Sequence, residues 1–440
     1  MNNIKVRFAP SPTGYMHIGN TRTAVFNWLL ARKLGGKFML RIDDTDTARS
    51  KQEYEDALRD VLQWLGLNWD EEARQSARLD RYNQVVETLK QQGRVYACYE
   101  TAEELEVMRK RLMSRGLPPI YDRASLKLSA EQIAAYQAEG RRPHYRFKLT
   151  PGIIEWQDMV RGVCRYDAAN LADPVIIRED GSYLYHLPSV IDDADFGITH
   201  IIRGEDHVTN TALQVQMFEA LKAPIPSFAH LPLLTGTEGK LSKRLGSLGV
   251  RELRDEGVEA LAISSFLAKL GTSESIEPFY NLDSLAASLD LNKLGRSQPK
   301  FDVEELKNFN THYVRSLPFT NVKDRVDVTE DFWNKVRGNL EKVSDINTWQ
   351  QICSQKLNPV IEDEELTSSA AAILPSEPWG ENTYSEWVAE LKKVSGKSGK
   401  NLFHPLRMAL TAAPQGPELK TLLPLIGREK AYARLMGKAA

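Results

Sequence analysis

The chain has 440 residues, and its 57 Lys and Arg nearly balance its 59 Asp and Glu, so the net charge is −2. Bulk charge therefore gives no argument for nucleic-acid binding, and any such surface must come from local patches. Three widely spaced cysteines exclude a disulfide framework, and no apolar run approaches the roughly 20 residues of a membrane span. We expect a cytoplasmic monomer of two or three domains, with no membrane partner.

The first segment reads as a strand over residues 4–8, a loop, and a helix over residues 21–34. Two prolines stiffen the loop, while Gly14 and Gly19 allow the backbone to approach a ligand. Asn20 is a good N-cap, and the N–H groups of the helix start suit an anion such as a phosphate. His17 adds a donor beside it. The alternative is a rigid turn that carries a surface histidine.

Further strands are expected at residues 37–42, 197–204 and 228–234, and helices at residues 53–65 and 209–221. Alternating strands and helices predict a parallel sheet with its site at the carboxyl ends of the strands. Residues 69–183 interrupt the pattern as an insertion with helical stretches at 101–115 and 129–139 and a β-like piece at 145–149. From residue 258 onward the chain reads mainly helical.

A basic loop follows the last of these strands. Lys240, Ser242 and Lys243 lie between Gly239 and Gly246. A loop of this kind can close over the phosphates of ATP and neutralise a departing pyrophosphate. A basic loop by itself is usually only solvated, so the inference depends on its pairing with the first segment.

Together the two segments resemble the HIGH-type and KMSKS-type motifs of class I aminoacyl-tRNA synthetases. They read His-Ile-Gly-Asn at residues 17–20 and Lys-Leu-Ser-Lys-Arg at 240–244. Asn20 replaces the second histidine of the first motif, so that histidine's role is not carried over. Residues 7–14, 40–46, 201–207, 404–407 and 424–427 are similar to bacterial glutamyl-tRNA synthetases. The resemblance covers nearly the whole chain.

This resemblance implies an α/β fold: a Rossmann-type catalytic domain with a connective insertion, followed by an all-α anticodon-binding region. It places the catalytic halves at residues 1–68 and 184–234 and the insertion, which guides the acceptor end of tRNA, at 69–183. The basic loop and a stem-contact helical domain span 235–309, and the anticodon-binding domain spans 310–440. A block at residues 391–440 carries ten Lys or Arg and two Glu, which makes it a candidate for phosphate contacts.

The resemblance also implies roles for individual residues. His17, Lys240 and Lys243 would be catalytic. Asp43 stands where Glu is usual, and Ser189 where Asn is frequent. ATP would contact Pro10, Gly14, His17, Gly19, His207, Lys240, Ser242 and Lys243. Glutamate would contact Arg7, Ser11, Asp43, Tyr185, Ser189 and Arg203.

Some of these residues also have structural interpretations. The planar guanidinium of Arg7 suits a carboxylate, yet Arg7 can instead pair with Asp43 or Asp44. His207 lies where an adenine-stacking residue is expected, but it can also be an ordinary loop histidine. The acidic clusters at residues 43–46 and 192–195 can be caps and salt-bridge partners rather than metal sites. We expect magnesium to arrive with ATP and no metal to be held by the protein alone.

Many bacterial members of the family hold zinc in the insertion through a Cys-x-Cys pair and a later Tyr-x-Cys. Here those positions read Cys98-Tyr99-Glu100 and Tyr121-Asp122-Arg123, and His144 belongs to a different stretch. One thiolate of three remains, whereas a closed zinc site needs four suitable ligands. We therefore expect no zinc.

The implied function is the ATP-dependent ligation of L-glutamate to tRNA(Glu), with the charging of tRNA(Gln) left open. Glutaminyl-tRNA synthetases share the catalytic motifs but have a β-barrel C-terminal half, and glutamyl-queuosine-type paralogues end soon after the second motif. A tRNA-binding regulatory paralogue without catalysis is the alternative from another class. Retention of His17, Lys240, Ser242 and Lys243 argues against it.

Overall fold

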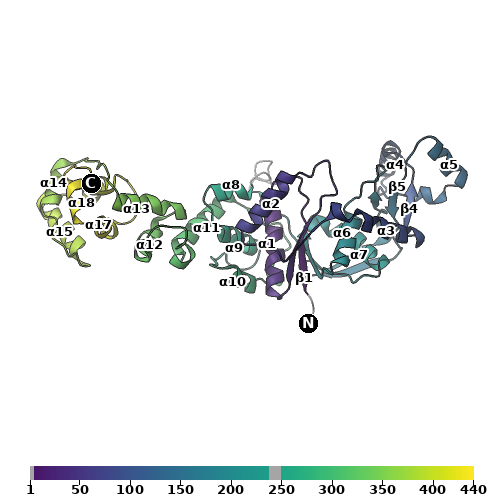
Figure 1. Ribbon diagram of the computed structural model, residues 1–440, viewed down its shortest axis with the longest axis horizontal. Helices are drawn as coiled ribbons and strands as arrows, with labels where there is room; N and C mark the ends of the chain where they lie inside the picture. The colour runs from purple at the N-terminus through teal and green to yellow at the C-terminus, as the bar shows by residue number, and fades with distance from the viewer. Residues whose placement is uncertain (1–3, 237–248) are drawn as a thin grey trace. The chain divides into compact units, whose positions relative to one another are not determined.

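The structure, a computed structural model, describes residues 4–236 and 249–440 (Figure 1). The chain divides into two compact units. The first comprises Met1–Arg254 and Ile263–Asp302, and the second comprises Asp255–Ala262 and Val303–Ala440. Within the described residues, none of the helices has both the length and the apolar character needed to cross a bilayer.

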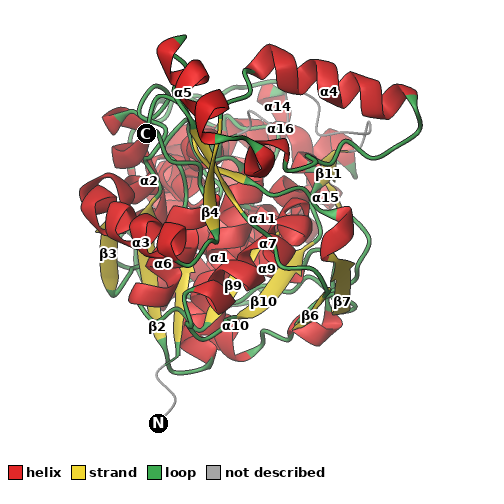
Figure 2. Cartoon of the chain, turned by 90° about the vertical axis from the view of Figure 1, so that its right-hand side faces the viewer, coloured by secondary structure: helices red, strands yellow, loops and turns green. Residues whose placement is uncertain are grey.

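A seven-stranded sheet organises the first unit, and several of its strands are labelled in Figure 2. Its spatial order is β3-β2-β1-β9-β10-β6-β7, and the neighbours pair in parallel except for the β6–β7 hairpin. β1 and β9 are adjacent although nearly 200 residues separate them, so the loop that follows β1 and residues 201–207 lie at the same edge of the sheet. The strands are β1 Lys5–Phe8, β2 Lys37–Ile42, β3 Glu71–Arg74, β6 Ile153–Asp158, β7 Gly162–Asp167, β9 His200–Gly204 and β10 Ser227–Leu231.

Helices pack against both faces of this sheet. α1 (Ile18–Lys33) buries residues on all sides because β1, β2 and β9 contact one side and α10 another. A large apolar cluster joins the sheet to α3, α6 and α7 and includes Tyr82, Leu187, Phe218 and Phe228. Besides α1, the α-helices before residue 303 are α2 Gln52–Trp64, α3 Leu79–Gln91, α4 Ala102–Ser114, α5 Ala130–Ala138, α6 His186–Asp195, α7 Val208–Ala220, α8 Val250–Asp255, α9 Ala260–Lys269 and α10 Leu282–Ala287.

Two smaller sheets complete the first unit. In residues 69–183, β4 Val95–Cys98, β5 His144–Phe147 and β8 Val175–Ile177 form a three-stranded sheet. The hairpin of β6 and β7 belongs to the same stretch of chain, yet it extends the main sheet through the parallel pairing of Phe228 with Asp158. β11 Thr235–Gly236 pairs with β12 Lys300–Phe301.

From residue 303 onward every element is helical. The helices are α11 Val303–Ser316, α12 Glu330–Val336, α13 Ile346–Ser354, α14 Glu364–Ala372, α15 Thr383–Ser395, α16 Lys400–Thr411, α17 Leu419–Ile426 and α18 Arg428–Leu435. Trp333 and Trp387 are the largest fully buried side chains of this unit. The α/β fold and the all-α C-terminal region predicted from the sequence are thus confirmed.

Three sequence-based boundaries were wrong by three residues each. β10 ends at Leu231, whereas the sequence pattern extended it to residue 234. α1 begins at Ile18 and is capped by His17, whereas the sequence pattern placed the cap at Asn20. β9 begins at His200 rather than residue 197, because Gly197 has φ +66° and follows the end of α6. Helix α6 and strands β3, β6 and β7 were not predicted individually. β3 reads Glu-Glu-Ala-Arg, and such a charged sequence carries no strand signal.

We predict that Gly416→Ala destabilises the helical unit by about 2 kcal/mol or more, because the new Cβ would overpack a filled site. Gly416 has φ +142°, and a Cβ there would lie 1.9 Å from the Trp349 ring. Chemical denaturation followed by tryptophan fluorescence is the measurement. Gly338→Ala is the matched control, since nothing lies within 4 Å of its Cβ position. Equal unfolding midpoints for the two variants would contradict the prediction.

Candidate active site

A cavity of about 660 Å³ opens at the carboxyl ends of β1, β2, β9 and β10. It brings together ten of the residues singled out from the sequence. Gly14 lies in the same loop but does not line the cavity, and Lys240, Ser242 and Lys243 lie outside the described residues. The ten predicted residues that line the cavity are Arg7, Pro10, Ser11, His17, Gly19, Asp43, Tyr185, Ser189, Arg203 and His207.

His17 joins the first loop to α1. Its Nδ1 accepts hydrogen bonds from the backbone N–H groups of Gly19, at 3.1 Å, and Asn20, at 3.3 Å. Two of the backbone N–H groups at the start of α1 are therefore already occupied by this cap. Burial lowers the pKa of His17, so its ring is neutral and carries its proton on Nε2. The imidazole Nε2–H of His17, rather than these two backbone groups, therefore remains available as a donor on the cavity lining.

Arg203, the fourth residue of β9, is buried among neutral partners. Its Nη2 donates to Thr211 Oγ1 at 2.6 Å and to Gln214 Oε1 at 2.7 Å, and its Nε lies 3.4 Å from His230 Nε2. Among the described residues, no carboxylate forms an ion pair with it. Burial lowers the pKa of Arg203 to about 10, so the guanidinium remains charged at neutral pH. An anionic ligand would supply the missing partner.

Arg7, in contrast, is paired. Its Nε and Nη2 donate to the two carboxylate oxygens of Asp193, at 3.1 and 3.4 Å. The suggested pairing with Asp43 or Asp44 was therefore wrong about the partner, although a carboxylate does hold Arg7. Asp193 shares its Oδ1 with Arg41, whose Nη1 donates to it at 2.7 Å. A line of alternating charges thus forms one wall of the cavity.

The same wall contains Asp43. Arg41 binds Asp43 bidentately, at 2.7 and 3.0 Å, and Ser189 Oγ lies 3.5 Å from the same carboxylate. Asp43 and Ser189, whose side chains are shorter than those usual at these positions in the family, therefore contact each other. Burial raises the pKa of Asp43 to about 6 although the charge of Arg41 opposes the shift. Asp43 is ionised at neutral pH, and its charge is shared with Arg41.

Tyr185 and His207 also line the cavity. Tyr185 Oη lies 3.2 Å from His207 Nδ1, and the amide nitrogen of Asn210 lies at the same distance from that atom. An amide N–H can only donate, so Nδ1 accepts and Nε2 carries the proton. Burial lowers the pKa of His207 to about 4 and raises that of Tyr185 to about 12, so both groups are neutral near pH 7.

The acidic clusters at residues 43–46 and 192–195 are held by arginines. The structure favours their interpretation as salt-bridge partners over a metal site. The pairs are Asp43 with Arg41, Asp44 with Arg74, Asp46 with Arg49, Asp192 with Arg78, Asp193 with Arg7, and Asp195 with Arg81.

Sequence reasoning missed four residues that organise this site: Arg41, Asp193, His230 and Asp158. Arg41 and Asp193 lay inside motifs that were quoted, but their contacts run between segments about 150 residues apart. Arg41 and His230 each interrupt an apolar run that was predicted as a strand, and such a polar residue is the signal that could have singled them out. Asp158 lies in no predicted element and carried no such signal.

Comparison with known proteins gives this arrangement its family. The model for "tRNA synthetases class I (E and Q), catalytic domain" matches residues 3–308, and that for "Anticodon binding domain" matches residues 288–437. Glutamate–tRNA ligase 2 of Methylobacterium sp. (strain 4-46) is 52% identical over 443 residues, covering 99% of both chains. Glutamate–tRNA ligase 2 of Beijerinckia indica is 51% identical over 450 residues, covering 100% of both.

The chain belongs to the glutamate–tRNA ligase family. A crystal structure of a glutamate tRNA ligase from Elizabethkingia meningosepticum in complex with its amino acid matches with a TM-score of 0.81. That match is 29% identical and covers 99% of this chain and 98% of the other. The protein is thus a class I aminoacyl-tRNA synthetase, and the order predicted from the sequence, a catalytic domain before an anticodon-binding domain, is confirmed.

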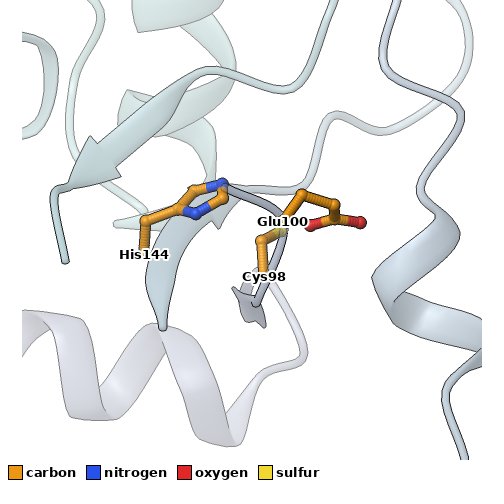
Figure 3. Close-up of side chains that lie close together, drawn as sticks. All are labelled: Cys98, Glu100 and His144. Atoms are coloured by element: carbon orange, nitrogen blue, oxygen red, sulfur yellow. The ribbon is translucent and has the colours of Figure 1, made fainter. Parts of the chain in front are cut away.

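Cys98, the cysteine that remains of the zinc pattern, lies at the end of β4 and beside β5. Antiparallel pairing sets Cys98 opposite His144, so the ligating atoms of Cys98, Glu100 and His144 lie within 4.8 Å of one another (Figure 3). His144 is therefore a neighbour of Cys98 despite its distance in sequence. The Glu100 carboxylate accepts hydrogen bonds from the hydroxyl of Tyr121, at 2.6 Å, and from that of Ser125, at 2.8 and 2.9 Å.

We predict that His17→Asn and His17→Ala separate two functions of this residue. Asn can keep the cap on α1 but lacks an Nε2–H group, whereas Ala lacks both. His17→Ala should lower the free energy of unfolding by about 1 kcal/mol, and His17→Asn by much less. Both should slow glutamate activation by about 100-fold, because both lose the donor that faces the cavity. Thermal unfolding and pre-steady-state adenylate formation are the measurements. Full activity in the Asn variant would show that His17 acts only as a cap.

Proposed function

We propose that this synthetase joins L-glutamate to tRNA(Glu) in two steps. In the first, a glutamate carboxylate oxygen attacks the α-phosphorus of ATP, forming glutamyl-adenylate and releasing magnesium pyrophosphate. In the second, a ribose hydroxyl of the terminal adenosine of tRNA attacks the activated carbonyl and releases AMP. The observation that carries the proposal is the charged, buried Arg203 without a described carboxylate partner, in a cavity that also contains His17 and the first loop.

Two guanidinium groups would read the amino acid. Arg203 offers a full positive charge to a carboxylate, while Arg7 lines the same cavity but shares its charge with Asp193. An acidic substrate is favoured because a neutral side chain would leave Arg203 buried and unpaired. Ser11, Asp43, Tyr185 and Ser189 line the cavity and are proposed as the remaining glutamate contacts. The ionised Asp43 is proposed to face the substrate's ammonium group.

The nucleotide would occupy the His17 side of the cavity. Pro10, Gly19 and His207 line it as well, and their neutral character leaves room for the charge of the phosphates. We propose that His17 donates from Nε2 to a phosphate oxygen, with Gly14, Lys240, Ser242 and Lys243 completing the ATP contacts. Mg²⁺ bound with ATP would supply further charge neutralisation. The protein's own contribution is to position the reactants in line and to stabilise charge as pyrophosphate departs.

We predict that Arg7→Ala lowers the catalytic efficiency with glutamate by at least about 100-fold, because a charge-assisted hydrogen bond in a desolvated site is lost. ATP–pyrophosphate exchange with varied glutamate is the measurement. Arg32→Ala is the matched control, since Arg32 also pairs with an aspartate, Asp70 at 2.9 Å, but lies outside the cavity. If Arg7→Ala matches the control, then Arg7 only supports Asp193.

The tRNA would contact two parts of the chain. Residues 69–183 are proposed to guide the acceptor end, and the helical unit to read the anticodon. A second cavity of about 660 Å³ in that unit is lined by Arg315, Trp349 and Arg407 among others. Arg407 Nη2 donates to the Pro417 carbonyl at 2.9 Å, while its Nη1 is buried without a partner there. A cation with a free donor beside amide and carboxylate groups suits the edge of a nucleobase.

The basic block at residues 391–440 contributes less to phosphate binding than its charge suggests. Arg428, Lys430 and Arg434 donate to backbone carbonyls within the unit, and Lys397 pairs with Asp363. The exposed cations of the block are better candidates for phosphate contacts. These are Lys392, Lys393, Lys400, Lys420 and Lys438.

We also propose that the insertion folds without zinc. Three candidate ligands lie together, but Glu100 is engaged by two hydroxyl groups. The Tyr121 hydroxyl stays protonated because burial and the neighbouring Glu100 raise its pKa. Arg123 stands where the family has a thiolate, and it binds Asp173 at 2.7 and 2.8 Å. These residues therefore fit a hydrogen-bonded cluster better than a tetrahedral zinc site.

We predict that chelator treatment leaves the unfolding temperature of this enzyme unchanged. Elemental analysis of the dialysed, untagged protein should find far less than one zinc per chain, since a site of this composition should bind zinc too weakly to survive dialysis. As an internal control, Glu100→Cys restores a second thiolate and should raise zinc retention. Near-stoichiometric zinc that survives a chelator in the unmodified protein would contradict the proposal.

The principal test is ATP–pyrophosphate exchange with glutamate, with and without tRNA, followed by charging of purified tRNAs. Glutamate-dependent exchange and glutamyl-tRNA(Glu) are expected. Tight tRNA binding without either reaction would favour the regulatory paralogue. Charging of tRNA(Gln) with glutamate would widen the tRNA set, and we propose tRNA(Glu) as its core. Sedimentation of the free enzyme tests the expected monomer.

A further inference from the structure

A buried chain of polar side chains lies behind Arg203, and the reaction proposed above does not use it. His230 Nδ1 lies 2.5 Å from Asp158 Oδ2, and its Nε2 lies 2.8 Å from Thr211 Oγ1 and 3.4 Å from Arg203 Nε. His230 has an exposed fraction of 0% and Asp158 of 1%. Buried polar groups of this kind are costly unless they do something that apolar residues cannot.

Asp158 fixes the proton of His230. Its Oδ1 accepts hydrogen bonds from the backbone N–H groups of Val160, Arg161 and His230, at 3.0, 2.9 and 3.2 Å. Burial favours protonation of Asp158, but the His230 and backbone hydrogen bonds outweigh it and lower its pKa. Burial lowers the pKa of His230 despite the hydrogen bond to Asp158. Near pH 7 the pair is therefore a carboxylate and a neutral imidazole protonated on Nδ1.

This tautomer leaves Nε2 with a lone pair that faces Arg203 and Thr211. The hydroxyl of Thr211 can donate to Nε2 while it accepts from Arg203 Nη2 at 2.6 Å. Gln214 also accepts a hydrogen bond from Nη2, so these polar side chains hold the Nε and Nη2 side of the Arg203 guanidinium. Among the described residues, Nη1 has no hydrogen-bond partner, and Arg203 lines the cavity.

A carboxylate at the position of His230 would hold Arg203 more strongly. It would also neutralise the charge that a substrate carboxylate needs. A neutral acceptor oriented by a more distant carboxylate fixes the geometry and leaves the charge free. We propose that Asp158 and His230 are positioning residues that present Arg203 to the carboxylate of the amino acid and so set the affinity for an acidic substrate. This inference rests on the proposed function, in which Arg203 binds that substrate.

The test begins with Asp158→Asn. The Asn Oδ1 can keep the backbone hydrogen bonds, but its NH₂ group must face Nδ1 of His230. His230 would then carry its proton on Nε2, where it opposes the N–H donor of Arg203. We expect the KM for glutamate to rise by about tenfold or more, while the KM for ATP changes by less than about twofold. The unfolding temperature, measured in parallel, should change little.

His230 variants separate positioning from simple packing. Gln can place Oε1 near the position of Nε2 and accepts without help from Asp158, so His230→Gln should retain a KM for glutamate within about threefold of the original. His230→Leu fills the site without an acceptor and should match Asp158→Asn. In the His230→Gln background, Asp158→Asn should have no further effect on that KM, because the variant has no imidazole whose tautomer Asp158 could fix.

Arg203→Gln completes the set. If it leaves the KM for glutamate unchanged, the assigned role of Arg203 fails, and the inference fails with it. If Arg203→Gln raises that KM but Asp158→Asn and His230→Leu do not, only the positioning inference is overturned. Equal increases for glutamate and ATP, or additive effects of Asp158→Asn and His230→Gln, would also overturn it, since either would indicate general loss of structure.

Discussion

Arg203 keeps its positive charge in a buried position where its described hydrogen-bond partners are a hydroxyl, an amide and an imidazole. Removing a charge from water is unfavourable unless it is paired. An anion bound beside Arg203 would therefore be stabilised. The surrounding elements keep the charge in this position, because β9 supplies the arginine while α7 and β10 supply the neutral groups that hold it.

The remaining charges follow from this constraint. Arg7 and Arg41 lie close by, and Asp193 and Asp43 compensate them on the wall formed by β1, β2 and α6. The nearby histidines are neutral, since burial and the field of Arg203 lower the pKa values of His186 and His207 to about 4. Arg7 and Arg41 are thus compensated by carboxylates, whereas Arg203 has no described carboxylate partner. An acidic amino acid with a carboxylate at one end and an ammonium group at the other matches this polarity.

Much of the fold could be predicted from local sequence patterns. Apolar runs bounded by turn residues gave β1 and β2 to within one residue, and helical spacing located α2 and α7 similarly. The family resemblance singled out ten residues that line the cavity, and all of them except Tyr185 and Ser189 lie in contiguous motifs. The cap on α1 could not, because histidine is an uncommon N-cap and Asn20 is a common one. The partners of Arg7 and Arg203 could not either, since they depend on how distant strands and helices are brought together.

The same limit applies to the insertion. Its helices α4 and α5 begin with capping boxes at Thr101 and Ser129, and such local signals are readable. The proximity of Cys98 and His144 depends instead on strand register, which pairs two residues that are 46 positions apart in the chain. A sequence can show which ligands are missing, but it does not show which residue has moved in beside those that remain.

The β6–β7 hairpin lies in the same stretch of chain as the insertion but forms the edge of the catalytic sheet, and its Asp158 reaches the core beneath Arg203. This arrangement bears on any attempt to build chimeric synthetases. Exchanging residues 69–183 between relatives would also exchange the carboxylate that orients His230. A graft that keeps β6 and β7 with the recipient, and moves only the part built on β4, β5 and β8, would leave the amino-acid site with its own support.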